Sequence, residues 1–242
     1  MKKNISPVIL LTGLLLLFLS ESCKPSRVLV FSKTLGFRHT SIAAGKTALL
    51  KLGAANKFAV DTTEDASVFT KAQLKKYASV VFLNTTGDVL DSLQQFAFTR
   101  YIKRGGGFVG VHSATDTEYG WPWYGKMVGA YFNGHPKPQE ATFIIKDKIF
   151  LATSFFTDTI WKRTDELYNF KNMNPDVHVL VCIDESSYEG GTNGSYHPFS
   201  WYHAYDGGRA FYTAMGHTDE TYSDSNFIKH LLGGIKYAMK KK

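Results

Sequence analysis

The sequence predicts an α/β fold with a doubly wound, mostly parallel sheet, helices on both faces and an antiparallel hairpin near the C-terminus. Short apolar runs alternate with helical segments over residues 27–111, as in parallel strands joined by crossover helices. Later in the chain, the extended runs 199–205 and 209–215 flank the turn Asp206-Gly207-Gly208, which indicates a hairpin.

Four strands of the first half are expected from apolar runs at 27–32, 58–62, 79–83 and 108–111. Between them, helices should begin after side chains that can cap them: at Thr40 or Ser41 to about residue 52, at Thr70 to residue 77, and at Asp91 to about residue 104. In the third of these helices, which begins at Asp91, apolar side chains recur at close to helical spacing and are expected to face the core: Leu93, Phe96, Ala97, Tyr101 and Ile102.

The second half is less regular. A short helix is expected near Pro122, and extended segments at 140–145, 164–170 and 177–183. The hairpin follows, and residues 225–239 should form a closing helix.

Residues 1–22 are expected to be a signal peptide and residues 23–242 a single domain. Lys2 and Lys3 precede an apolar stretch at 8–19 that is short for a membrane span but typical of a secretory signal. The segment ending at Cys23 resembles a loose bacterial lipobox, although Ser20 and Glu21 depart from its tighter form. We therefore expect export to the periplasm, or a lipid anchor on Cys23 that attaches the protein to the outer membrane, with ordinary cleavage as the open alternative.

The charge pattern argues against a nucleic-acid partner. The formal net charge is +7, but the basic residues are scattered, apart from the three lysines at the end of the chain. Cys182 lies in an apolar run, so a buried, inert thiol is expected and a disulfide framework is excluded.

Polar side chains follow three of the predicted strands. Arg38 and His39 follow the first, Asn84 and Thr85 the third, and the pair His112-Ser113 the fourth. Because ligands bind at the carboxyl ends of strands in open α/β sheets, these side chains should converge at one edge and form a site.

Three histidines after predicted strands, His39, His112 and His217, are the first candidates for catalysis. They could act as acid/base groups or bind a divalent metal ion with an open position, although the sequence requires no cofactor. Asp116 could orient a histidine, and Glu166 could act as a base or accept sugar hydroxyls. We expect His112 at a strand end rather than in the core, and we read His178 and His230 as structural.

Substrate contacts are expected from polar and aromatic side chains near these loops, because aromatic faces pack against the apolar faces of sugar rings. The candidates are Arg38, Asn84, Thr85, Ser113, Trp123, Tyr124, His135, Tyr168, Tyr202 and His203. Ser113 is expected to make a polar contact rather than to act as a nucleophile, because no GxSxG motif surrounds it.

Six motifs occur in an order that resembles the ThuA-like (trehalose-utilisation) family. They begin at Arg38-His39, Val111-His112, Gly134-His135, Thr164-Asp165-Glu166, Ser200-Trp201-Tyr202 and Gly208-Arg209, the last leading to Gly216-His217. The resemblance implies a flavodoxin-like fold of the class I glutamine-amidotransferase type and a role in carbohydrate utilisation. The amidotransferase reaction itself is excluded, because the elbow that carries the nucleophilic cysteine in those enzymes reads Val111-His112-Ser113-Ala114.

We therefore expect an enzyme that performs histidine acid/base chemistry on a small-molecule carbohydrate, namely a sugar or keto-sugar, with a lyase, isomerase or hydrolase outcome left open. Two alternatives stay open: a non-catalytic carbohydrate-binding lipoprotein and a metal-dependent hydrolase. The oligomeric state is not predicted.

Overall fold

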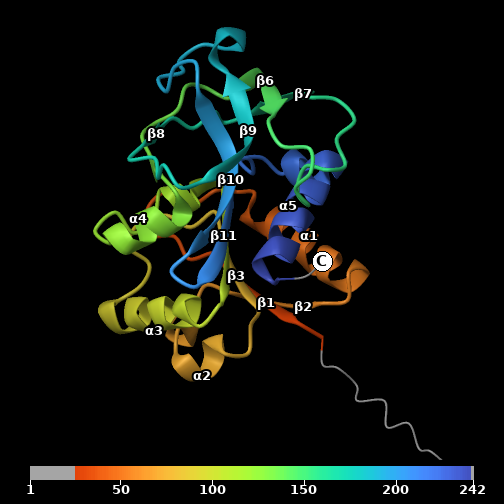
Figure 1. Cartoon of the computed structure of the whole chain (residues 1–242). Coiled ribbons are helices and arrows are strands. Elements are labelled where there is room, and N and C mark those ends of the chain that lie inside the picture. Colours follow the sequence, from red (N-terminus) through yellow and green to blue (C-terminus); the bar gives the residue numbers. More distant parts are fainter. Residues whose placement is uncertain (1–24, 241–242) are drawn as a thin grey trace, which may run out of the picture.

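A computed structural model describes residues 25–240 of the chain (Figure 1). The expected signal peptide and the lipidation site at Cys23 lie outside the described residues. None of the helices within 25–240 combines the length and the apolar character needed to span a bilayer.

A mixed sheet runs through the described chain, in the order β2-β1-β3-β4-β11-β10-β9-β6-β7. Its parallel half consists of β2 (Ala59–Thr63), β1 (Arg27–Phe31), β3 (Ser79–Leu83), β4 (Gly107–Val111) and β11 (Gly208–Thr213). Its antiparallel half continues through β10 (His197–Tyr205), β9 (His178–Asp184), β6 (Gln139–Ile145) and β7 (Ile160–Asp165). A separate two-stranded ribbon pairs β5 (Tyr131–Phe132) with β8 (Phe170–Lys171).

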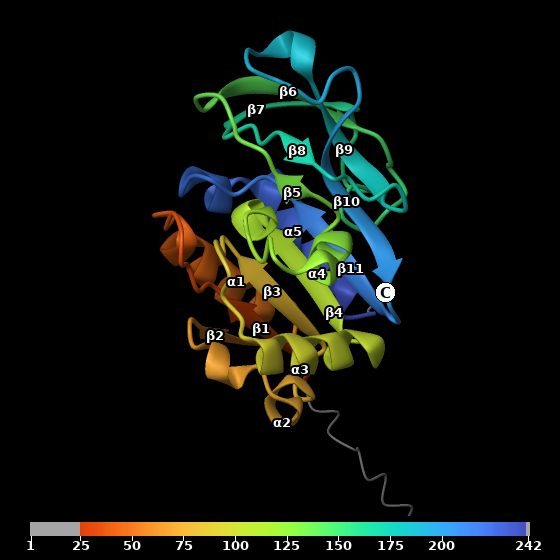
Figure 2. The same cartoon turned by 90° about the vertical axis from the view of Figure 1, so that its left-hand side faces the viewer.

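Helices cover both faces of the parallel half. Viewed along the sheet, α1 and α5 lie on one side and α3 and α4 on the other, with α2 below α3 (Figure 1; Figure 2 shows the sheet from the side of α3 and α4). Their bounds are α1 (Ile42–Ala55), α2 (Lys71–Leu74), α3 (Ser92–Lys103), α4 (Pro122–Val128) and α5 (Ser225–Ala238). The expected helices are therefore present, with ends that differ by a few residues.

The α/β class, the parallel order of β1, β3 and β4, and the C-terminal hairpin are confirmed. The sheet is more mixed than expected, because three further strands, β9, β6 and β7, extend it antiparallel beyond the hairpin. The hairpin joins the two halves, since β11 pairs parallel with β4 while β10 pairs antiparallel with β11.

Two local expectations about helices are wrong. Leu93 and Phe96 do not face the core: their exposed fractions are 79% and 65%, because the buried face of α3 is formed by Phe98, Tyr101 and Ile102. Ser41 is the residue before α1, but its side chain does not cap the helix. Its hydroxyl instead donates to the backbone carbonyl of Gly216, far away in the sequence.

Candidate metal centre

His112 is the first residue after β4, and its backbone is strained. It begins a short 3₁₀ turn, His112–Thr115, with φ of 51°, a left-handed conformation that non-glycine residues rarely adopt. Such strain persists only where the surrounding structure enforces it, and it concentrates at functional sites. The side chain is completely buried, so the expectation that His112 stands clear of the core is wrong.

Three more side chains converge on His112. Nε2 of His39 lies 3.1 Å from Nε2 of His112. Oε2 of Glu166 lies 3.3 Å from Nε2 of His112, 3.9 Å from Nε2 of His39 and 3.1 Å from Nδ1 of His217. One nitrogen or oxygen from each of the four residues lies within 4.8 Å of the others. The predicted meeting of the three histidines is confirmed, and Glu166 joins them.

The inner nitrogens of the three histidines face one another and the carboxylate of Glu166. Nδ1 of His112 lies 2.7 Å from the carbonyl oxygen of Ala214, which can only accept, so Nδ1 carries a proton. Nε2 of His112 is hydrogen-bonded to Nε2 of His39, where one of the two nitrogens donates, and it also faces a carboxylate oxygen of Glu166. The buried Nδ1 of His217 lacks hydrogen-bond geometry toward Glu166 and has no other partner among the described residues.

The pKa values follow from burial and from these contacts. Burial lowers the pKa of His39, against the opposing effect of Glu166. The carboxylate of Glu166 raises the pKa of His217. Burial alone would raise the pKa of Glu166, but contact with His112, His217 and His39 outweighs it and holds that pKa below its ordinary value. An anionic carboxylate thus faces imidazoles whose inner nitrogens point at it, an arrangement that a bound cation satisfies.

The donor set fits a transition metal ion. Imidazole nitrogen and carboxylate oxygen are the ligands of many zinc sites, and a site with three or four protein ligands can keep a position open for water or substrate. The carbonyl of Ala214 supplies the second hydrogen bond that commonly fixes the tautomer of a ligating histidine. The sequence-based metal set named the three histidines; the structure adds Glu166.

A buried polar network fixes the loop that carries His217. The carboxylate of Asp165 accepts from the backbone N–H groups of Gly216 and His217, at 3.4 and 3.3 Å, and from the guanidinium of Arg163 at 2.9 Å. The side-chain amide of Asn84 donates to the carbonyl of Gly216 at 3.1 Å. Asn84 therefore positions the loop rather than facing the centre of the cluster.

An outer layer surrounds Glu166. Nδ1 of His135 lies 3.2 Å from Oε1, the oxygen that does not face the other histidines, and the His135 side chain is 37% exposed. The ring of Tyr168 lies 4.3 Å from that of His112 and is buried against it. Ser113 places its hydroxyl 3.4 Å from Nδ1 of His39. All three predicted residues therefore lie at the cluster.

Three other predicted residues near the same edge have different partners. Arg38 turns outward to a two-point ion pair with Glu64. Thr85 exchanges a buried hydrogen bond with Thr117, and Asp116 accepts from the hydroxyl of Tyr119 rather than from a histidine. The expectation that Asp116 orients a histidine is not met.

Four predicted ligand contacts lie elsewhere. Trp123 donates to Asp206, in the hairpin turn at the far end of β11, and Tyr202 stacks on Phe150. Tyr124 and His203 are buried and bonded to the backbone carbonyls of Ala114 and Met127 respectively. These side chains fill space or anchor α4, because the apolar surface of the sheet has to be covered, and the structure does not bring them to the cluster.

One residue at the cluster was missed. Phe37 is 67% exposed, and its ring lies 4.8 Å from that of His39. The sequence held a weak signal, because Phe37 stands two positions before His39 in a loop that follows a strand end. An aromatic side chain that stays exposed beside a polar cluster is suited to contacting a ligand.

The fold is of the class I glutamine-amidotransferase-like α/β type, and the residue directly after β4 is a histidine. Residues 27–238 match the family described as ThuA, trehalose utilisation, and the chain belongs to this family. Cys182 is the free, buried cysteine of the described chain, and burial raises the pKa of its thiol to about 11. The thiol is thus inert, as expected.

Solved structures with the same fold include two ThuA-like proteins. The one from Bacteroides uniformis shares 24% identity, with 90% of this chain and 93% of that chain covered and a TM-score of 0.77. The one from Parabacteroides merdae shares 19% identity over 90% and 91%, with a TM-score of 0.75. A β-galactosidase from Bacillus circulans sp. alkalophilus contains a similar fold in 31% of its length, covering 90% of this chain, at 12% identity and a TM-score of 0.56. No curated protein matches the sequence.

Proposed function

We propose that His39, His112, Glu166 and His217 bind a divalent transition metal ion of the zinc class, and that the protein is a carbohydrate-utilising enzyme whose reaction takes place at this centre. The observation that carries the proposal is the meeting of four ligand atoms, from three imidazoles and one carboxylate, within 4.8 Å of one another. Removing such a cluster from water is costly unless a cation or protons compensate it.

A bound ion of this kind would polarise a sugar carbonyl or hydroxyl, or lower the pKa of a water molecule. The protein supplies the rest. Ser113 and the carbonyl of Ala214 contact Nδ1 of His39 and Nδ1 of His112, respectively. These contacts orient the two rings so that each Nε2 faces the proposed metal position. His135 is partly exposed, and its Nδ1 lies 3.2 Å from Oε1 of Glu166 and 2.9 Å from the carbonyl of Pro136, so its Nε2 is available to exchange a proton with a substrate.

A carbohydrate substrate is supported by family membership and by the side chains at the surface of the cluster. The ThuA family is described by trehalose utilisation. Phe37 offers an exposed aromatic ring beside His39, and apolar sugar faces pack on such rings. Proton transfer next to the carbonyl of a keto-sugar suits a centre with histidine, a carboxylate and a Lewis acid, so we propose keto-sugars as the first substrates to test.

The test combines metal analysis with turnover. Purified protein should hold about one equivalent of metal. Turnover on a panel of sugars and keto-sugars should cease when the metal is stripped with a chelator and return when Zn²⁺, Mn²⁺ or Co²⁺ is added. Metal-independent turnover would overturn the metal-centre proposal. Sugar binding without any turnover would instead identify a non-catalytic carbohydrate-binding protein.

For the N-terminal segment we propose export and acylation of Cys23. In cell fractionation, Cys23→Ala should release the protein from the membrane fraction, because acylation supplies most of the membrane affinity. Unchanged membrane association of that variant would count against a lipid anchor.

A further inference from the structure

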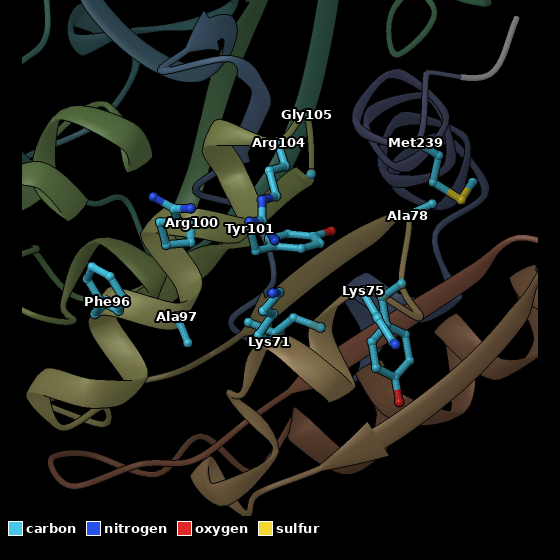
Figure 3. A pocket seen from close by; sticks show the side chains of 13 residues that line it. Lys71, Lys75, Ala78, Phe96, Ala97, Arg100, Tyr101, Arg104, Gly105 and Met239 are labelled. Carbon is cyan, nitrogen blue, oxygen red and sulfur yellow. The ribbon is translucent and has the colours of Figure 1, made fainter.

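A cavity of about 650 Å³ lies at the end of the parallel strands opposite the histidine cluster. It opens between α2 and α3, and its lining includes Ala78, directly before β3 (Figure 3). Gly106, directly before β4, also lines it. This is the amino edge of the sheet, whereas His112 follows the carboxyl end of β4. Neither the metal centre nor the proposed reaction uses this cavity.

Four exposed cations surround the cavity: Lys71 and Lys75 from α2 and the residue after it, and Arg100 and Arg104 from α3 and the residue after it. No acidic side chain belongs to the lining. Within residues 25–240, none of the four forms an ion pair, whereas other surface cations such as Arg27 and Lys46 do. Four basic residues that are scattered in the sequence are thus gathered here without counter-charges.

The floor of the cavity is apolar. Leu74 and Met239 are buried there. Tyr101 also lines the cavity, and its hydroxyl is bonded to the backbone of Gly107, so the ring is the part of this side chain that a ligand would contact. On the rim, Phe96 is 65% exposed. An apolar floor under four unpaired cations complements a ligand with an anionic head and an apolar body.

The position of the cavity indicates a membrane as the source of that ligand. β1 begins at Arg27 on this edge, because Arg27 accepts a backbone hydrogen bond from Ala78 of the cavity lining. Cys23 precedes Arg27 by four residues, so an acyl anchor there could be no more than about 14 Å away along the chain. A helix that exposes Leu93 and Phe96 together with Arg100 also has the side-chain pattern of a helix lying in a bilayer interface.

We infer that this cavity binds the headgroup and the upper acyl chain of an anionic phospholipid, and that it holds the domain on the membrane with the histidine cluster facing away from the bilayer. The phosphate would lie among Arg100, Arg104 and the two lysines, and the apolar part would lie over Tyr101 and Leu74. Anionic lipids attract clustered basic side chains in this way.

Calorimetric titration of the full chain with short-chain soluble lipids tests the inference. Dihexanoyl phosphatidylglycerol should bind, and the zwitterionic dihexanoyl phosphatidylcholine should bind at least tenfold more weakly. Arg100→Gln/Arg104→Gln should weaken the phosphatidylglycerol affinity at least tenfold. The matched pair Lys137→Gln/Lys162→Gln, which removes the same charge from exposed positions outside the cavity, should change it less than twofold.

Three results would overturn the inference: equal affinity for the two lipids, an affinity unchanged in the Arg100/Arg104 variant, or equal losses in the two double variants. Glycerol 3-phosphate separates lipid from free phosphate. If it bound as tightly as the lipid, the site would recognise a soluble phosphate ester and the assignment to a membrane lipid would be wrong. Thermal unfolding of each variant identifies any loss of binding that is caused by misfolding.

Discussion

His230 and His112 are both completely buried histidines, yet their surroundings differ in kind. His230 has a partner at each ring nitrogen: the carbonyl of Ala152 at 2.8 Å and the hydroxyl of Ser200 at 2.9 Å. Burial lowers its pKa to about 4, so the ring is neutral and satisfied. His112 has such a partner at one nitrogen, and its other nitrogen faces an imidazole and a carboxylate.

The comparison shows that burial does not distinguish a structural histidine from a functional one. The two kinds of histidine are distinguished by the chemical nature of the groups that contact their ring nitrogens. At His230 one nitrogen meets a carbonyl, which accepts, and the other meets the Ser200 hydroxyl, which also contacts the Tyr212 carbonyl, so each ring nitrogen has a neutral polar partner. An imidazole nitrogen that faces a second imidazole and a carboxylate either shares a proton with them or binds a metal ion, and a fold retains such a group where it has a use.

The largest effect is expected for the structural histidine. His230→Ala should lower the free energy of unfolding by about 3 kcal/mol, since it opens a cavity and leaves the Ala152 carbonyl without its partner, while the Ser200 hydroxyl keeps its bond to the Tyr212 carbonyl. Urea unfolding of the metal-free protein measures this, and zinc affinity should stay within about twofold. The expectation that His178 is structural is wrong, because its side chain is exposed, and it serves as the control: His178→Ala should change stability by less than about 0.5 kcal/mol. A His230 variant of normal stability would break the comparison.

For the cluster, Glu166→Gln is the sharper substitution than His112→Ala, because it keeps the side-chain volume and does not leave the Ala214 carbonyl unbonded. Zinc affinity should fall about 100-fold, since the anionic ligand shared by three histidines is lost. The melting temperature of the metal-free protein should change little. Unchanged zinc affinity in calorimetry would show that Glu166 is not a ligand.

A smaller effect is expected at Ser113, whose hydroxyl lies 3.4 Å from Nδ1 of His39. Ser113→Ala should lower zinc affinity by no more than about tenfold, because it removes only a group that orients a ligand. Turnover should fall by a similar factor. A loss of several orders of magnitude in turnover, with zinc still bound, would instead identify Ser113 as a nucleophile.

The parallel half of the fold was predictable because its signals are local. Each signal is contained in a few neighbouring residues: the apolar run before His112, the capping residues of α3, and the polar side chains after β1, β3 and β4. The rules for parallel sheets then place the ends of these strands, with their polar side chains, at one edge. His39 and His112 were paired for this reason. Phe96 was misplaced because spacing alone does not show which side of α3 meets the sheet.

The contribution of Glu166 to the cluster could not be predicted in the same way. Glu166 follows β7, which is separated from β4 by β11, β10, β9 and β6 in the sheet. Its approach to His112 depends on the order of the antiparallel strands and on the ribbon of β5 and β8, and both are set by long-range pairing. Trp123 and Tyr124 were placed near His112 because they are close to it in sequence, but α4 turns them toward other partners.

The smallest effect is expected at a surface ion pair beside the cluster. Glu64 accepts from Arg38 at 2.9 and 3.0 Å and lies 2.6 Å from Lys46, and the two cations lower its pKa from 4.5 to about 2. A lowered carboxyl pKa stabilises the folded protein at a pH above about 4.5, and this stabilisation is lost as the pH falls from there through about 2.

Glu64 is 40% exposed, so solvent screening keeps the contribution below about 1 kcal/mol. Glu64→Gln should therefore lower the free energy of unfolding by about 0.5–1 kcal/mol at pH 6, and the difference from the unsubstituted protein should vanish toward pH 2. Glu189→Gln, at an exposed carboxylate that has no ion pair among the described residues, is the control and should show no such difference at either pH. If the Glu64 variant lost more than about 2 kcal/mol, or also lost zinc affinity beyond tenfold, the Arg38–Glu64 pair would hold the His39 loop in place. The surface pair and the buried cluster would then be one cooperative unit rather than two independent features.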